Sequence, residues 1–315
     1  MSKISKVIGI IVLSIPLLIE ADKGMMPVIP NISIYEPGQK AIIAWNGESK
    51  MEILILAVDA YADTECKVIE ILPLPSEPKV DTGSVESFKS MQRLIMKHAP
   101  KPLYRGKGPP PPMLDGTEGV EILFHKKIGA HNITCAKALK YQEFVDWTYK
   151  FIKSQGIDTF FFPSELPYII EEYLNKDIQY FVFDIVELGK NPSSIAPLIY
   201  EFASPYLFFP LRISRLVKGK TKIQLFLITE YPVWLPAIKP FEIGRYSSAG
   251  RYQMLKSAGD EIMFEITKEE LRTISPLLVN LFSGNVWVTA MKFDGPAVSL
   301  TNDLSIREFY KRIKY

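Results

Sequence analysis

Cysteine and histidine are scarce in this chain, which has 2 Cys and 3 His among 315 residues. So few soft ligands exclude a scaffold built around several zinc or iron–sulfur sites, because each such site takes up to four of these side chains. An excess of either charge is also missing, since 37 Lys and Arg against 35 Asp and Glu leave a net charge of +2. Proteins that bind nucleic acid usually present a clearly basic face, so we expect no nucleic-acid partner.

Sequence motifs that carry well-known chemistry are missing as well. The chain has no GxxxxGK[ST] or GxGxxG loop, no GxSxG elbow, no HExxH helix and no CxxCH site. Each of these motifs brings backbone amides or ligands together at a fixed spacing, so we expect no cofactor. Catalysis by a triad or by carboxylates scattered along the chain stays open.

Long hydrophobic runs are limited to the N-terminus. The apolar run Val7–Ile19 follows Lys3 and Lys6 and is succeeded by Glu20-Ala21-Asp22. This order is typical of a secretory signal peptide, whereas a membrane-spanning helix needs about 20 apolar residues. We therefore predict a signal peptide over residues 1–21, with an uncleaved N-terminal anchor as the alternative. The protein would be secreted or lie at the outer face of the cell membrane, with membrane contact only through this segment if it is uncleaved.

Export changes the interpretation of the two cysteines. Outside the reducing cytosol, Cys66 and Cys135 are a candidate disulfide, and two free thiols are the alternative. Two triplets, Asn31-Ile-Ser and Asn132-Ile-Thr, have the form of N-glycosylation acceptors.

Three potential metal ligands lie close together in the sequence: His125, His131 and Cys135. A thiolate and two imidazoles could hold a soft metal ion if adjacent strands brought them together. On a single strand, however, His131 and Cys135 would lie about 13 Å apart, too far for one shared metal. We therefore favour surface histidines and a structural cysteine over a metal site.

Short β-branched runs separated by turn signals dominate the chain after Gly24 and predict strands. The predicted strands cover residues 32–35, 40–45, 51–59, 67–72, 120–127, 130–138, 179–188, 198–202, 208–214 and 222–229. The pair Asn46-Gly47 predicts a hairpin with a type I′ turn. Helical spacing predicts helices over residues 84–97, 141–154, 164–175 and 305–313, and a capping box at Thr267–Glu270 opens another.

Proline is concentrated in one internal segment, where Pro109–Pro112 follow Gly106 and Gly108. This composition favours a semi-rigid polyproline spacer. We predict an N-terminal α+β domain over residues 22–99, a Pro-rich spacer over 100–116 and a C-terminal α+β domain over 117–315. The fold class is α+β, with antiparallel sheets, helices packed on them, and two sub-domains joined by the spacer.

Two aromatic runs, Phe160–Phe162 and Tyr206–Phe209, could form a platform for a sugar or a protein partner. Aromatic residues more often fill a core or a seam between sheet and helix, and we favour that interpretation. The carboxylates of Glu171 and Glu172 beside Tyr173 indicate a solvated helix face.

Several short segments spread along the chain resemble motifs of one known family. They are residues 35–43, 73–80, 127–134, 144–147, 173–183, 197–200 and 209–213. Together they resemble a family of exported bacterial and archaeal proteins known as a domain of unknown function, number twenty-three thirty in its series, in an archaeal-type branch. This chain departs from the commoner bacterial form, because it lacks a cysteine near the mature N-terminus and has a longer spacer and C-terminal section. The resemblance implies export, and it implies no established activity, catalytic residue or cofactor.

Three functions are compatible with these features. The first is a non-enzymatic protein of the cell envelope or the extracellular space that binds or assembles, with itself or with a cell-surface polymer. The second is an exported hydrolase that acts on peptide or glycan through scattered carboxylates. The third is a binder of small ligands in which two domains close on a cleft. Convergent buried carboxyls would favour the enzyme, and an apolar patch or an open sheet edge would favour assembly.

Overall fold

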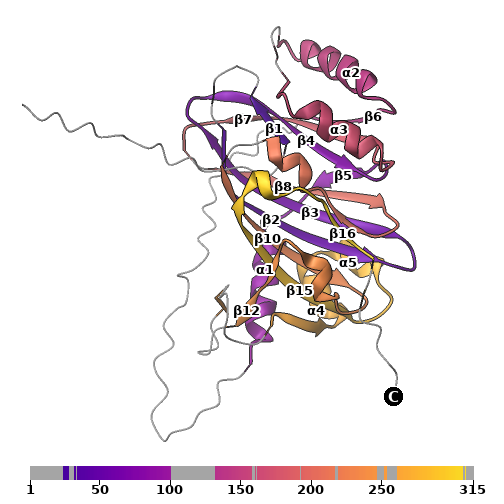
Figure 1. The fold of residues 1–315 in the computed structure, drawn as a ribbon. Coiled ribbons are helices and arrows are strands. Elements are labelled where there is room, and N and C mark those ends of the chain that lie inside the picture. The colour runs from indigo at the N-terminus through magenta and orange to yellow at the C-terminus, as the bar shows by residue number, and fades with distance from the viewer. Residues whose placement is uncertain are drawn as a thin grey trace, which may run out of the picture.

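The computed structural model describes residues 24–27, 32, 34–100, 132–157, 160, 162–191, 193–216, 219–246, 252–253, 261–307 and 309. Two β-sheets stack face to face in this part of the chain, and helices cover their outer faces (Figure 1). The predicted α+β class is confirmed. The predicted signal peptide, most of the predicted spacer, Asn31, His125 and His131 lie outside the described residues.

The small sheet has four antiparallel strands in the order β1-β4-β7-β6. Their bounds are Gly24–Pro27 for β1, Cys66–Leu74 for β4, Tyr180–Leu188 for β7 and Asn132–Lys137 for β6. The central strands bury both faces: along β4, Val68 and Leu72 face the large sheet, whereas Ile69 and Ile71 face the helices. This double burial explains why β4 and β7 are nearly continuous apolar runs.

The large sheet has the strand order β11-β15-β10-β2-β3-β8-β5, and β14 also pairs with β15. The bounds are Glu242–Ile243 (β11), Val286–Pro296 (β15), Lys220–Thr229 (β10), Ile34–Asn46 (β2), Met51–Ala62 (β3), Ser193–Ala203 (β8), Lys79–Thr82 (β5) and Met263–Ile266 (β14). Strands β10 and β2 run parallel, from Ile223 beside Gln39 to Thr229 beside Trp45. The large sheet is therefore mixed, whereas the sequence predicted antiparallel pairing.

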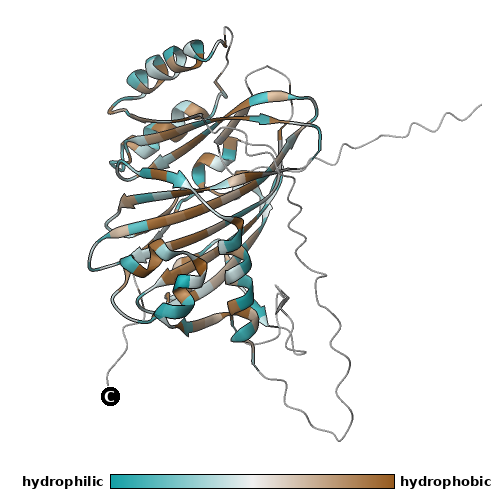
Figure 2. Ribbon diagram, turned by 180° about the vertical axis from the view of Figure 1, so that it is seen from behind, coloured by the Kyte–Doolittle hydropathy of each residue, from teal (hydrophilic) through white to brown (hydrophobic). Residues whose placement is uncertain are grey.

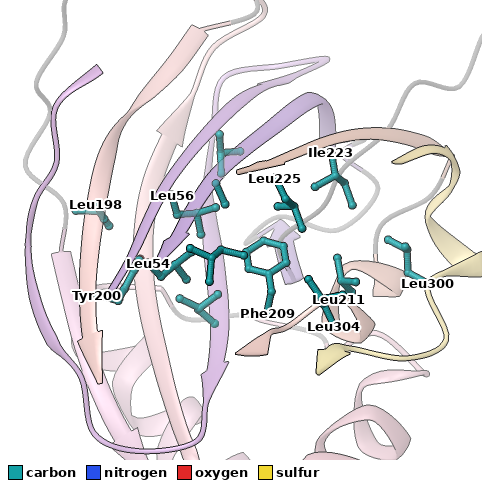
Figure 3. Close-up of a cluster of buried hydrophobic side chains, with 14 of the residues drawn as sticks. Leu54, Leu56, Leu198, Tyr200, Phe209, Leu211, Ile223, Leu225, Leu300 and Leu304 are labelled. Carbon is teal, nitrogen blue, oxygen red and sulfur yellow. The ribbon is translucent and has the colours of Figure 1, made fainter. Parts of the chain in front are cut away.

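One hydrophobic core fills the space between the sheets (Figure 3). Its large side chains include Leu54, Leu56, Leu198, Tyr200, Ile223 and Leu225, all from the large sheet. A two-stranded ribbon of β9 (Leu207–Phe209) and β16 (Leu304–Ile306) adds Phe209 and Leu304 to the same core. Full burial of one such side chain stabilises the fold by about 1.5–3 kcal/mol, so this core is a main source of stability.

The helices cover the two outer faces of the sandwich. On the large sheet lie α1 (Val85–Lys97), α4 (Lys268–Ile274) and α5 (Pro276–Leu281), and on the small sheet lie α2 (Tyr141–Ser154), α3 (Leu166–Leu174) and the 3₁₀ turn η1 (Arg212–Leu216). Hydrophobic residues concentrate along the strands, while the helices alternate apolar and polar residues (Figure 2). None of the helices in the described ranges is long and apolar enough to cross a membrane.

The segments before and after the predicted spacer share both sheets. Strands β2 and β3 lie between β10 and β8 in the large sheet, and β4 lies between β1 and β7 in the small one. The hydrophobic core between the sheets likewise draws residues from both segments. In the described part of the chain, the two predicted sub-domains are therefore not separate packing units.

Two local predictions are wrong in detail. The β2–β3 hairpin forms, but Asn46 and Gly47 do not make a two-residue type I′ turn: the connection spans residues 47–50, and Lys50 has the positive φ of 53°. The Asn46 side chain instead accepts hydrogen bonds from the amides of Glu48 and Ser49. The helix predicted from residue 305 is replaced at its start by β16, because residues 304–306 pair with β9.

Candidate functional site

The two cysteines lie on the strands that flank β7 in the small sheet. Cys66 of β4 is opposite Leu188, and Cys135 of β6 is opposite Val182. Six residues along a strand correspond to about 20 Å, whereas the Cα atoms of a disulfide lie within about 7 Å. Both cysteines are free thiols, and the predicted disulfide is wrong.

Cys135 is also a poor metal ligand. Partial burial and the negative charge of Glu77 raise the pKa of its thiol to about 11. Metal ions bind the thiolate, so a thiol that keeps its proton is disfavoured as a ligand. Within the described ranges, no group of three His, Cys, Asp or Glu side chains is placed to hold a metal ion. The potential acceptor Asn132 is the first residue of β6.

The aromatic runs singled out in the sequence are mostly core. Phe160, Leu207, Phe208 and Phe209 are buried, as the core interpretation predicted. Glu171 and Glu172 are exposed on α3, which confirms the solvated helix face. Glu172 forms an ion pair with Arg212 of η1.

A buried polar cluster ties α3 to η1 and to the segment before β16. The Tyr173 hydroxyl donates to Oδ1 of Asp303 at 2.8 Å, and the amides of Leu211 and Arg212 donate to the same oxygen at 3.0 Å. The hydroxyl in turn accepts from the Ile213 amide at 3.1 Å. Burial, followed by the charge of Asp303, raises the pKa of Tyr173 well above its usual value. This cluster satisfies backbone amides and is structural.

Three carboxyl groups are buried between the sheets. Glu70 and Asp184 are directly opposite each other on β4 and β7, and Glu52 lies on β3. Strand alternation points all three side chains toward the space between the sheets, where their neighbours along the strands are Val68, Leu54 and similar apolar residues. The exposed fractions are 2% for Glu70, 3% for Asp184 and 0% for Glu52. A substrate in solution therefore has no access to these carboxyl groups in this structure. Glu70 and Asp184 are therefore neighbours, but none of the three carboxyls lies at an accessible surface.

Exposed aromatic residues gather at the end of the sandwich where the β2–β3 hairpin turns. Tyr231 and Trp234 follow β10 and are 44% and 39% exposed. Of the two residues between them, Val233 is buried, and its backbone forms a bridge to Phe309. The Phe309 ring stacks on that of Trp45 in β2, with 5.3 Å between the ring centroids. We call the four residues Trp45, Tyr231, Trp234 and Phe309 the aromatic end.

The backbone that carries the two exposed rings is fixed by hydrogen bonds. The Thr229 hydroxyl donates to the Tyr231 carbonyl at 2.7 Å. The Ala237 amide donates to the Trp234 carbonyl at 2.9 Å, where the 3₁₀ turn η2 (Leu235–Ile238) begins. Pro232 between the rings further restricts the loop. Rings held in this way lose little conformational entropy when they bind a partner.

The hairpin side of the aromatic end is also anchored. The indole Nε1 of Trp45 donates to the Ser204 carbonyl at 3.0 Å. The Glu230 carboxylate accepts a hydrogen bond from the Gly47 backbone amide at 3.1 Å through Oε2. The side-chain Nδ2 of Asn46 donates to Oε1 of Glu230 at 3.4 Å. A side chain at residue 47 would crowd the Trp45 ring, because its Cβ would lie only 3.1 Å away. Glycine at this position lets the ring lie close to the turn.

The fold and this surface define an α+β sandwich with a preformed aromatic end. Comparison with protein-family models, with curated proteins and with solved structures found no match to this chain. The resemblance to a family of exported proteins therefore stays a prediction.

The sequence analysis did not single out Tyr231 and Trp234. A signal for them exists in the run Tyr231-Pro-Val-Trp-Leu-Pro236, in which two aromatic residues are each followed within two positions by a proline, directly after a predicted strand. Prolines exclude regular pairing there, so the aromatic side chains stand in a connection rather than in a sheet. The contribution of Trp45 and Phe309 has no local signal, because 264 positions separate them.

Proposed function

We propose that this protein is a non-enzymatic binding protein of the cell surface or the extracellular space, and that the aromatic end contacts a carbohydrate polymer. The observation that carries the proposal is the exposure of Tyr231 and Trp234 on a hydrogen-bonded, proline-restricted loop. A flat aromatic ring matches the C–H face of a sugar, and the Tyr hydroxyl and Trp N–H can bond its hydroxyl groups. The signal-like order of the first 22 residues supports the location.

Binding to a panel of neutral and acidic polysaccharides tests the proposal, with affinity electrophoresis as the measurement. We expect Trp234→Ala and Tyr231→Ala each to weaken retention about tenfold, since truncating an aromatic anchor costs at least about 1.4 kcal/mol. Tyr168→Ala is the matched control, because Tyr168 is 73% exposed but lies on α3. The proposal would be overturned if no polysaccharide retains the protein, or if Tyr168→Ala weakens retention as much as the two test substitutions.

A further inference from the structure

The β9–β16 ribbon connects the core between the sheets with the aromatic end. Leu207 and Phe209 from β9, and Leu304 and Ile306 from β16, are buried in that core. Three residues beyond β16, Phe309 stacks on Trp45. Any movement of the ribbon away from the large sheet would therefore pull at the ring that covers Trp45.

The side chain of Glu52 ties this ribbon to the large sheet. Its Oε2 accepts a hydrogen bond from the Phe208 amide of β9 at 2.8 Å. Its Oε1 is buried and has no hydrogen-bond partner within the described residues. Glu52 is also the direct cross-strand neighbour of Trp45 on β2 and of Phe202 on β8. The carboxyl thus lies where β2, β3, β8 and β9 meet, among apolar side chains.

Among the residues that the structure describes, no cation lowers the pKa of Glu52 or balances a negative charge on it. Burial raises the pKa of Glu52 well above its usual value, and the Phe208 amide opposes this only partly. On β8, Glu201 is engaged with Lys79 of β5, and beyond β16 the Arg307 guanidinium lies over the Tyr206 ring. Neither these groups nor Asp303, which accepts a hydrogen bond from Tyr173, contributes to the raised pKa of Glu52.

We propose that Glu52 is a pH-sensitive latch that holds the β9–β16 ribbon and its Phe309 against the large sheet when protonated and releases them when ionised. An ionised carboxylate in this apolar site would lose its hydration without gaining a counter-ion from the described part of the chain, so opening of the ribbon to water relieves the cost. The opened state would uncover Trp45. The effect on polysaccharide binding rests on the proposed function, whereas the latch itself does not.

The sign of the pH dependence follows from proton linkage. The folded state holds a proton on Glu52 at pH values where the unfolded chain, or the opened ribbon, has already lost it. Stability from this group is fully present below the usual pKa of a glutamate and is lost as the pH rises through the raised pKa of the folded state. The latch is therefore closed at low pH and opens as the pH rises.

Hydrogen–deuterium exchange of the full chain between pH 5 and pH 9, divided by the intrinsic exchange rate at each pH, tests the latch. We expect exchange in residues 204–209 and 304–307 to rise at least tenfold in the wild type, while β10 and β15 stay protected. In Glu52→Gln, whose amide oxygen can still accept from Phe208, the rise should disappear. Glu48→Gln, on the exposed hairpin tip, should behave as the wild type.

The pH profile of wild-type exchange can by itself contradict the latch proposal, so the test does not depend on whether Glu52→Gln folds. A ribbon whose normalised exchange is independent of pH contradicts it, as does an equal loss of protection in all strands. An unchanged pH profile in Glu52→Gln contradicts it too. Because exchange is measured without polysaccharide, failure of the latch and failure of the proposed function give different results.

Discussion

Cys66 and Cys135 have different exposure but the same chemical state. Cys66 is buried, and burial together with the charge of Asp63 raises the pKa of its thiol. Cys135 is exposed on the edge strand β6, yet partial burial of its sulfur and the charge of Glu77 raise its pKa to about 11. The thiolate is the reactive form, so both residues are weak nucleophiles near neutral pH.

We predict that the protein unfolds at the same temperature with and without a reductant, because no bond between the cysteines is there to be reduced. After denaturation without reductant, a maleimide should add to both thiols, as measured by intact mass. The reduced protein treated in the same way is the control. A chain that takes up no label until it is reduced would show that the cysteines are paired.

At the scale of elements, local signals determine several boundaries. Helix α2 occupies residues 141–154 as predicted and is followed by Gly156, whose φ is 76°. Helix α4 begins with the predicted capping box, in which the Thr267 side chain accepts from the Glu270 amide and the Glu270 side chain accepts from the Thr267 amide. Both features depend on residues within four positions, which is why sequence reasoning found them.

We predict that Gly156→Ala lowers the free energy of unfolding by about 1 kcal/mol, because an L-residue is strained in the left-handed region. A Cβ at Gly156 meets nothing within 4 Å, so the effect is conformational rather than steric.

Gly284→Ala is the matched control for this substitution. Its added Cβ also meets nothing within 4 Å, and its φ lies outside the positive region. We expect a change within about 0.5 kcal/mol, as for other surface substitutions. Urea denaturation measures both variants, and equal effects would show that the backbone conformation at residue 156 is not the cause.

Other elements were set by partners far away in the sequence. Residues 304–306 form β16 because β9, almost 100 positions earlier, pairs with them, although the sequence predicted that a helix begins at residue 305. Residues 36–38 carry turn signals, but β2 continues through them, and the register against β3 shifts between Tyr35 and Gly38. Pairing with β3 before and after this segment overrides the local signal, so the turn becomes an irregularity within the strand.

For the whole molecule, the shared sheets determine how the chain unfolds. The strands before residue 100 contribute to both sheets, and so do the strands after residue 131. Neither part can bury its apolar faces alone, because β2 and β3 are flanked by β10 and β8. Stability is therefore a property of the joint sandwich.

We predict a single cooperative thermal transition for the described sandwich. The calorimetric enthalpy should match the van't Hoff enthalpy, since both parts of the chain lose their core together. Leu225→Ala, which leaves a cavity between the sheets, should lower the stability by about 2–5 kcal/mol and move the whole transition. Two resolved transitions, with only one moved by Leu225→Ala, would show that the sub-domains unfold separately.

The sequence by itself determined the α+β class, most strands and helices, and the capping box at Thr267, because these depend on periodicity and on contacts within a few residues. Only the tertiary structure decided the parallel pairing of β10 with β2, the separation of Cys66 from Cys135, and the stacking of Phe309 on Trp45. The physical reason is that strand order and register are set by the joint burial of apolar faces, which no local pattern encodes.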